Sequence, residues 1–175
     1  MKLSLSLLVL ALAGILALPS ALAAEAGDYA GRFEVADAAA KDAELARAVE
    51  AAAQQFPALF RGLVRNKLGD AVRAPAFFVF SPGDGTMTIA SEAAPEGWTT
   101  PLDGTPTEVI TDKGKPLELS RWMEGGTLKA RGCQDLGCSD FTFDLKGDDL
   151  VLRVSTTSKR LEEPITYAVA YRRVK

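Results

Sequence analysis

The spacing of apolar residues along the chain changes from one section to the next. Residues 3–18 are an almost unbroken apolar run. Between about 37 and 68, apolar residues recur every three or four positions, which is the period of a helix with one buried face. From 75 onward they alternate with polar residues, which is the period of a strand with one buried face. These periods predict a leader, a helical section and a long β section.

The β section predicts short antiparallel strands joined by tight turns. A first strand is predicted before the helices, at 28–35, and further strands are predicted after them at 75–80, 86–91, 107–111, 117–123, 127–133, 141–146, 150–154 and 165–171. Residues 93–104, rich in Pro, Gly and Thr, predict a loop that contains Trp98. Short connections favour pairing of strands in sequence order. We therefore expect a mainly β (α+β) fold, an antiparallel up-and-down β-barrel of about eight to ten strands.

Residues 37–68 predict a pair of helices that follows the first strand. The first helix carries an apolar stripe with helical spacing, made of Leu45, Val49, Ala52 and Phe56. Asp37 is a good N-cap for this helix, and Pro57 would end it and begin the second one. Gly69 would end the second helix. We expect the apolar stripe to pack against the strands.

The N-terminal apolar run predicts a cleavable signal peptide over residues 1–23. Lys2 precedes the run, and Ala-Leu-Ala at 21–23 has the small-x-small form of a cleavage site. The run is shorter than the roughly 20 residues that a membrane span needs. We therefore expect one mature domain over 24–175, exported to the periplasm or secreted, with no transmembrane segment after cleavage. An uncleaved N-terminal anchor is the alternative.

The composition argues against several classes of function. Cleavage removes one basic residue, Lys2, so the formal charge changes from −3 to −4. Such a mildly acidic domain has no electrostatic footprint for nucleic acid, and its overall charge does not favour anionic lipid surfaces. The chain has no histidine, which excludes Ser-His-Asp catalysis and His-based zinc sites. The aspartates between 135 and 149 lack the spacing of a calcium loop. We expect no metal, no cofactor and no enzymatic activity.

Cys133 and Cys138 are the only cysteines in the chain. In an oxidising compartment, two cysteines this close most simply form a disulfide, here across a hairpin loop at 134–137. A redox pair or half of a metal site is the alternative interpretation.

The order of one strand, a helix pair and a β meander resembles that of the calycins, above all their fatty-acid-binding-protein branch. The resemblance implies a barrel with the helix pair over its mouth. Lipocalins, another branch, close the barrel with a G-x-W element in the first strand and an arginine in the last. Gly31-Arg32-Phe33 stands at the first position with Phe in place of Trp. The resemblance therefore implies barrel-closing roles for Gly31, Phe33 and an arginine of the last strand, Arg172 or its neighbour Arg173.

Two further comparisons concern the C-terminal section. Residues 167–173 read YAVAYRR where the fatty-acid branch has a carboxylate-binding R-x-Y, so that site does not carry over. The stretches 156–161, 164–167 and 171–173, together with 101–106, are similar to uncharacterised exported bacterial proteins, and this similarity implies no activity.

One face of the predicted strands is apolar and would point into the barrel. The residues on it that we consider candidate ligand contacts are Met87, Leu119, Phe141, Phe143, Tyr167 and Tyr171. Arg121 shares this face, and a buried guanidinium needs a partner. That partner could be the carboxylate or phosphate of a ligand, with the tyrosine hydroxyls beside it. Alternatively, Arg121 pairs with a buried Asp or Glu or reaches water at the rim, and the aromatic side chains fill the core.

These features favour an exported carrier, expected to be a monomer, that binds an apolar or amphipathic ligand inside the barrel, including anionic lipid-like molecules. The first alternative is a non-enzymatic envelope interaction protein or inhibitor with a packed barrel, whose envelope protein partner would contact Trp98 or Trp122. The second is an enzyme with a Lys, Tyr or carboxylate mechanism, for which the sequence offers no recognisable constellation.

Overall fold

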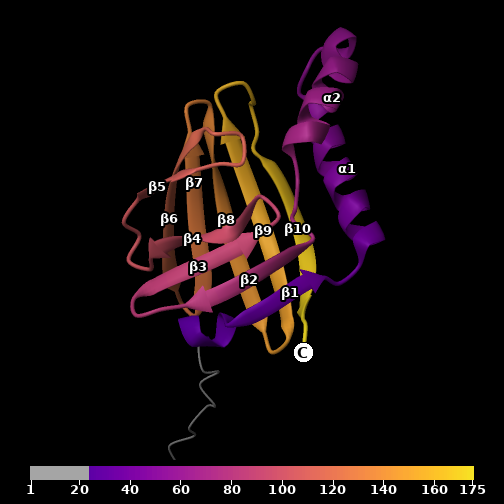
Figure 1. Ribbon diagram of the computed structural model, residues 1–175. Coiled ribbons are helices and arrows are strands. Elements are labelled where there is room, and N and C mark those ends of the chain that lie inside the picture. The colour runs from indigo at the N-terminus through magenta and orange to yellow at the C-terminus, as the bar shows by residue number, and fades with distance from the viewer. Residues whose placement is uncertain (1–23) are drawn as a thin grey trace, which may run out of the picture.

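The computed structural model describes residues 24–175, in which ten antiparallel strands form one sheet that curls into a nearly closed barrel (Figure 1). The predicted signal peptide lies outside the described residues. The strands are β1 (Gly31–Val35), β2 (Phe77–Pro82), β3 (Thr86–Ser91), β4 (Ala94–Pro101), β5 (Thr107–Ile110), β6 (Pro116–Glu124), β7 (Thr127–Gln134), β8 (Gly137–Lys146), β9 (Asp149–Ser158) and β10 (Ile165–Arg173). Their order in the sheet is β4-β3-β2-β1-β10-β9-β8-β7-β6-β5. Consecutive strands are neighbours in the sheet, as predicted, except β4 and β5, which form its two edges. The first strand, β1, pairs with the last, β10.

The helices lie between β1 and β2 in the sequence, as the periodicity predicts. They are α1 (Ala38–Gln54) and α2 (Arg61–Ala71), with short 3₁₀ helices η1 (Ala26–Tyr29) before β1 and η2 (Ala58–Phe60) before α2. The N-cap is confirmed, because the Asp37 carboxylate accepts the Ala40 N–H at 3.0 Å. No helix in the described range is both long enough and apolar enough to span a lipid bilayer.

Alternation along the strands separates the inner and outer faces of the barrel. In β10, Ile165, Tyr167, Val169 and Tyr171 are buried, while the residues between them are exposed or half-buried. Tyr167 lies beside Val154 of β9, which lies beside Phe141 of β8. The inward-facing side chains therefore form continuous rows across strands, which is the arrangement that the period of two predicts.

The structure corrects two predicted boundaries. Residues 94–101, predicted as part of a loop, form the edge strand β4, and an edge strand tolerates proline because its outer N–H groups need no partner. A bulge in the β3–β4 pairing accompanies this strand, and Gly97 adopts φ +77° close to Thr88, where a Cβ would collide. The second helix also continues through Gly69 to Ala71, and its last turn is completed by the Val72 N–H donating to Leu68 C=O.

α1 runs beside β10 and takes the place of a longer first strand (Figure 1). β1 pairs only with residues 171–173 of β10, so the remaining edge of β10 needs other partners. The Ala36 N–H donates to Ala170 C=O at 3.0 Å. The Glu44 carboxylate accepts the Ala168 N–H at 3.1 Å, and the Arg47 guanidinium donates to Thr166 C=O at 3.4 Å. α1 thus covers a strand edge that would otherwise be open to other chains.

The predicted apolar stripe of the helix pair is only partly in the core. The buried residues of α1 are Ala48, Ala52 and Ala53, while Leu45, Val49 and Phe56 are half-buried. α2 has no buried residue. Small alanine side chains allow α1 to approach the sheet closely, and α2 is held mainly through α1.

Aromatic side chains fill one end of the barrel. Phe78 and Phe80 contact Phe143 with ring centroids 5.6 and 5.5 Å apart, and Phe78 also contacts Tyr171 at 5.1 Å. The η1 turn covers this end, because the Tyr29 hydroxyl donates to Phe143 C=O at 2.6 Å and accepts the Leu128 N–H at 3.0 Å.

Candidate functional site

The two edge strands of the sheet, β4 and β5, face each other across the gap in the barrel, which we call the seam. Arg121 of β6 reaches across the seam to β3 and β4. An isolated bridge joins Asp103 to Trp122, and the Gly104 N–H donates to Arg121 C=O at 2.8 Å. The Arg121 side chain points inward and is only 3% exposed. Its Nη1 donates to Met87 C=O at 2.8 Å and to Trp98 C=O at 2.7 Å, with Thr100 Oγ1 at 3.4 Å.

The charge of Arg121 is not compensated by an acidic side chain within residues 24–175. No ion pair involves it there, and its buried Nε has no hydrogen-bond partner. Burial lowers the pKa of Arg121 to about 10. Its protein acceptors all bind Nη1, whereas a carboxylate or phosphate binds a guanidinium best through a two-nitrogen edge. The Nε–Nη2 edge is therefore the edge of the guanidinium that has no hydrogen-bond acceptor within the described residues.

The two candidate tyrosines bind backbone carbonyls of the segment that joins α2 to β2. The Tyr167 hydroxyl donates to Arg73 C=O at 2.8 Å, and the Tyr171 hydroxyl donates to Pro75 C=O at 2.9 Å. Burial raises the pKa of Tyr167 to about 12 and raises that of Tyr171 as well. These hydroxyls therefore hold the 73–75 segment against β10, and neither of them bonds to Arg121.

The other candidate contacts share the inner face but not one cluster. Met87 and Leu119 are buried on the strands that Arg121 connects. Phe143 is buried in the aromatic cluster, and Phe141 is half-buried one row further along β8. The candidate ligand contacts therefore do not form one site. Met87 and Leu119 lie on the strands that Arg121 connects, whereas Phe143 lies in the aromatic cluster and Phe141 lies apart from both.

Two surface grooves lie beside the helix pair, and the sequence gives no signal for either. A groove of about 660 Å³ lies between α1, α2 and residues 72–74, with Leu45, Val49 and Val72 in its wall. A groove of about 390 Å³ lies between α1 and the outer face of β8–β10, and of the candidate contacts only Tyr167 lines it. Neither groove is lined by Arg121.

Of the two candidate arginines in β10, Arg173 contacts Phe33 and the η1 segment, while Arg172 lies on the outside. The Arg173 guanidinium lies over the Phe33 ring, 4.4 Å from its centroid, and donates to Asp28 C=O at 2.6 Å and to Ala30 C=O. Gly31 adopts φ +121° with Arg173 close to it. Arg172 forms an exposed ion pair with Asp149 at 3.0 Å.

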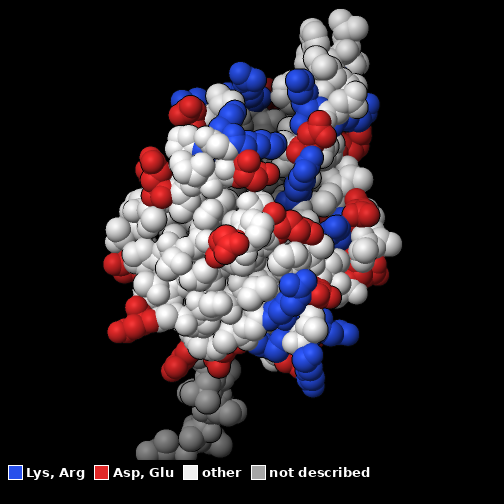
Figure 2. All heavy atoms as spheres, viewed as in Figure 1, with Lys and Arg blue, Asp and Glu red and all other residues white. Residues whose placement is uncertain are grey.

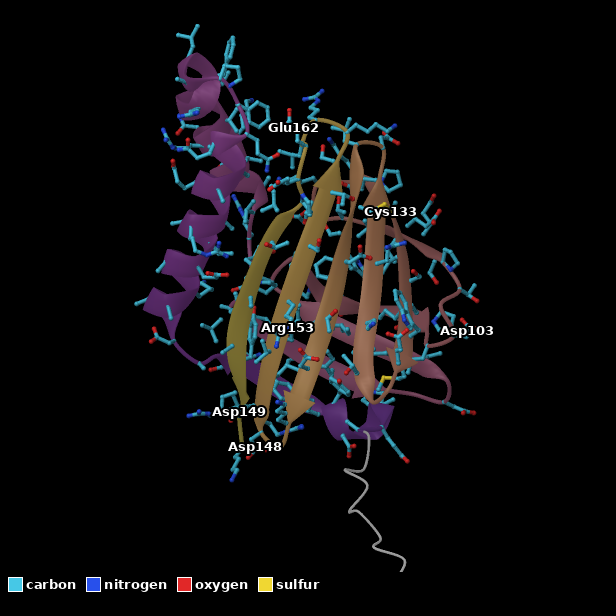
Figure 3. The ribbon with its side chains drawn as sticks, turned by 180° about the vertical axis from the view of Figure 1, so that it is seen from behind. Asp103, Cys133, Asp148, Asp149, Arg153 and Glu162 are labelled. Carbon is cyan, nitrogen blue, oxygen red and sulfur yellow. A yellow bond between two sulfur atoms is a disulfide. The ribbon has the colours of Figure 1, made fainter. Side chains whose placement is uncertain are left out.

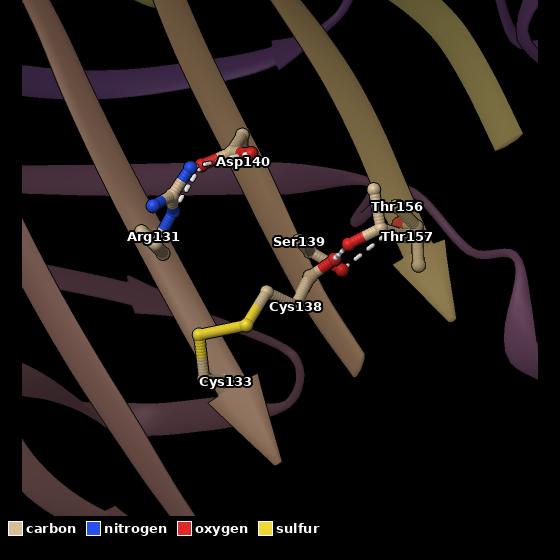
Figure 4. Close-up of polar contacts among 7 residues, drawn as sticks. All are labelled: Arg131, Cys133, Cys138, Ser139, Asp140, Thr156 and Thr157. Carbon is tan, nitrogen blue, oxygen red and sulfur yellow. Dashed lines mark hydrogen bonds and ion pairs between the residues drawn. A yellow bond between two sulfur atoms is a disulfide. The ribbon is translucent and has the colours of Figure 1, made fainter. Parts of the chain in front are cut away.

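The predicted disulfide is confirmed at the tip of the β7–β8 hairpin (Figure 4). Cys133 and Cys138 are cross-strand neighbours, and Gln134 pairs with Gly137 so that two residues form the turn. On the next row, the Ser139 and Thr156 hydroxyls bond to each other at 2.8 Å. Within residues 24–175, no group of three or more His, Cys, Asp or Glu side chains could hold a metal ion.

Comparison with known proteins identifies the fold. No family model and no curated protein sequence matches the chain. Among solved structures, it is similar to Echinococcus granulosus fatty-acid-binding protein 1, with 14% identity, a TM-score of 0.52 and coverage of 85% of this chain and 99% of that chain. It is also similar to a zebrafish ileal bile acid-binding protein complexed with cholic acid, with 12% identity, a TM-score of 0.53 and coverage of 84% of this chain and 99% of that chain. The fluorescent protein UnaG is similar as well, with 17% identity, a TM-score of 0.55 and coverage of 86% of this chain and 100% of that chain. The chain therefore has the barrel fold of these structures, as the sequence resemblance implies.

Proposed function

We propose that the protein is a non-catalytic carrier, working outside the cytoplasm, that binds a small amphipathic molecule inside the barrel. The observation that carries the proposal is Arg121, a buried cation with no acidic partner and a free Nε. An uncompensated buried charge is costly, so a site that keeps one is expected to gain from an anionic ligand. The names of the structural neighbours, which include fatty-acid-binding and bile acid-binding proteins, support this ligand class.

The first experiment is native mass spectrometry of the protein purified from the periplasm without detergent. We expect a mass excess that solvent extraction removes as a lipid-like compound. A protein that carries no extra mass, and that gains none from palmitic acid or hexadecanol, would contradict the carrier proposal.

The second experiment compares an acid with a matching alcohol. Palmitic acid and hexadecanol are used to displace Nile red from the wild type, Arg121→Met and Arg121→Lys. We expect Arg121→Met to weaken palmitic acid binding by about tenfold or more and to leave hexadecanol unchanged, because a hydrogen-bonded charge contact is lost. Arg121→Lys keeps a cation without the two-nitrogen edge and should fall between the two.

The control is Arg131→Met, which removes an arginine from the outer face of the neighbouring strand, where it pairs with Asp140 at 2.6 Å (Figure 4). This change should affect neither ligand. Equal losses for the acid and the alcohol in Arg121→Met would contradict the role of Arg121 while leaving the carrier proposal intact.

The second candidate is a packed barrel that acts through protein contacts in the envelope. The aromatic cluster favours it, because Phe33, Phe78, Phe80 and Phe143 are all buried and occupy interior volume that a ligand would need. Trp98 and Trp122, the predicted partner contacts, are both half-buried, and Trp98 belongs to β4. A wild type that stays without ligand in both experiments would support this candidate.

A further inference from the structure

Two hydroxyl side chains occupy inner-face positions of the barrel where the strand pattern otherwise places apolar residues. Ser139 and Thr156 are cross-strand neighbours on β8 and β9. Their row continues to Gly132 and Leu119 on one side and to Ile165 on the other, and these three residues are buried. Because side chains alternate between the two faces of a sheet, both hydroxyls point into the barrel with this row.

The hydroxyl pair lies at the end of the barrel opposite the aromatic cluster. Ser139 comes directly after the hairpin closed by the Cys133–Cys138 disulfide, and Figure 3 shows Cys133 and Asp148 at opposite ends of the strands. Ser139 and Thr156 are half-buried, so they are reached from this end. The inner wall is therefore polar at the end through which a ligand inside the barrel would meet solvent.

The two hydroxyls keep unused hydrogen-bonding capacity. They bond to each other at 2.8 Å (Figure 4), and neither bonds to another group within residues 24–175. A hydroxyl has one proton to donate and two lone pairs, so the mutual bond leaves one proton and further lone pairs free. Hydrocarbon packed against these groups would cost free energy, whereas a ligand hydroxyl could both donate to the pair and accept from it.

An apolar stretch of the inner face lies between Arg121 and the hydroxyl pair. Arg121 is the cross-strand neighbour of Ala130, and Ala130 is the neighbour of Phe141. Phe141 is half-buried and lies two residues from Ser139 on β8. The small side chain of Ala130 leaves room between Arg121 and Phe141. An elongated ligand can therefore join groups that do not contact one another, running from Arg121 past Phe141 to the hydroxyl pair.

Strand geometry sets the separation of the two polar points. A spacing of about 4.8 Å between strands and a rise of about 3.4 Å per residue place the Cα atoms of Arg121 and Ser139 roughly 12 Å apart. A hydroxyl next to a ligand carboxylate is too close to that carboxylate to reach the pair. A hydroxyl near the middle of a long acyl chain is far enough from it.

We infer that the ligand is a hydroxylated amphipathic acid, with its anionic group at Arg121 and its hydroxyl bonded to Ser139 and Thr156. The chain between these groups contacts Phe141. The inference rests on the proposed carrier function and adds the chemical class of the ligand. It makes Ser139 and Thr156 specificity-determining residues, because a site that bonds a substrate hydroxyl discriminates against the analogue that lacks it.

The test measures displacement of Nile red by stearic acid, 12-hydroxystearic acid and 2-hydroxystearic acid. We expect the wild type to bind 12-hydroxystearic acid about tenfold more tightly than stearic acid, the effect of one well-placed hydrogen bond. The 2-hydroxy acid should bind like stearic acid, because its hydroxyl lies beside the carboxylate and away from the hydroxyl pair.

Ser139→Ala/Thr156→Val removes both hydroxyls with little change in shape. This variant should bind 12-hydroxystearic acid about tenfold more weakly than the wild type does and should lose the preference for it. Its binding of stearic acid should be no weaker than that of the wild type, which also shows that the variant is folded.

The matched control is Thr88→Val/Thr99→Val. The Thr88 and Thr99 hydroxyls also bond to each other, at 2.7 Å, but they lie on the outer face of β3 and β4. Figure 2 shows this face of the molecule, on which uncharged side chains predominate. The control should keep the full preference for 12-hydroxystearic acid.

The outcomes separate this inference from the carrier proposal. Equal binding of stearic acid and 12-hydroxystearic acid by the wild type, or a preference that survives in Ser139→Ala/Thr156→Val, would overturn the inference and leave the carrier proposal intact. A wild type that binds none of the three acids would count against the carrier proposal and would remove the inference with it.

Discussion

Two adjacent arginines at the end of β10 have opposite surroundings. Arg173 lies over the Phe33 ring and donates to the backbone of η1, whereas Arg172 pairs with Asp149 in solvent. The same alternation that turns Tyr171 inward turns Arg173 inward and Arg172 outward. The alternation of inward and outward residues along β10 therefore distinguishes Arg173 from Arg172, whereas the resemblance to lipocalins did not distinguish them.

We expect Arg173→Ala to lower the free energy of unfolding by about 1–3 kcal/mol, because it removes a cation–π contact and leaves carbonyls of η1 without their donor. Arg172→Ala should change it by less than about 0.5 kcal/mol, since an exposed ion pair contributes little. Urea unfolding measures both. Equal effects of the two substitutions would contradict the closing role of Arg173.

The role of Arg121 could be predicted only in part. Its position on an apolar face followed from strand alternation, and so did its need for a partner. The partners, however, are the backbone carbonyls of Met87 and Trp98 on other strands. Every residue has a backbone carbonyl, so the sequence does not show which carbonyls will accept from a buried arginine. Neither structural alternative that we considered, a buried Asp or Glu or water at the rim, describes the arrangement.

At the scale of elements, the helix pair and its place in the sequence were predicted correctly, but the packing of α1 along the edge of β10 was not predicted. The periodicity identifies two helices, but it does not show that β1 ends early and leaves the edge of β10 to α1. The contacts that decide this are Glu44 with the Ala168 N–H and Arg47 with Thr166 C=O. β4 was missed for a related reason: an edge strand with a bulge, Pro95 and Gly97 has the composition of a loop.

We expect Glu44→Ala to increase hydrogen exchange of the Ala168 amide by about fivefold to tenfold, the effect of losing one hydrogen bond. Glu34→Ala, which removes an exposed partner of Arg32, is the control and should leave that amide unchanged. Hydrogen bonds from Arg47 and from the Ala168 N–H lower the pKa of Glu44. Its contribution is therefore present above the unfolded pKa and lost as pH falls through the lower folded pKa. Unchanged exchange in Glu44→Ala would show that α1 does not protect this edge through Glu44.

At the scale of the whole molecule, the fold is the most predictable feature. Strand order, helix position in the sequence and the disulfide all follow from local patterns, because consecutive antiparallel strands pair through short turns. Closure depends on contacts between residues far apart in sequence, such as Tyr29 with Phe143, and these are not encoded in any local period.

The three tyrosines of the chain connect distant segments of the barrel, so their ionisation reports on its closure. Each hydroxyl donates to a remote carbonyl: Phe143 for Tyr29, Arg73 for Tyr167 and Pro75 for Tyr171. Burial raises the pKa of all three, that of Tyr167 to about 12. Between pH 10 and 12 the folded state therefore holds protons that the unfolded chain has released. Stability is lost as pH rises through that window, by roughly 2–3 kcal/mol from Tyr167.

Ultraviolet titration should show no tyrosine half-ionised at pH 10 in the folded protein. In urea, all three tyrosines should be half-ionised near pH 10. The burial of Arg121 acts in the opposite direction, so Tyr167→Phe, which removes only the tyrosine contribution, should flatten the alkaline loss of stability. A native tyrosine that ionises with the midpoint of the unfolded chain would mean that its segment is not held against the barrel as described.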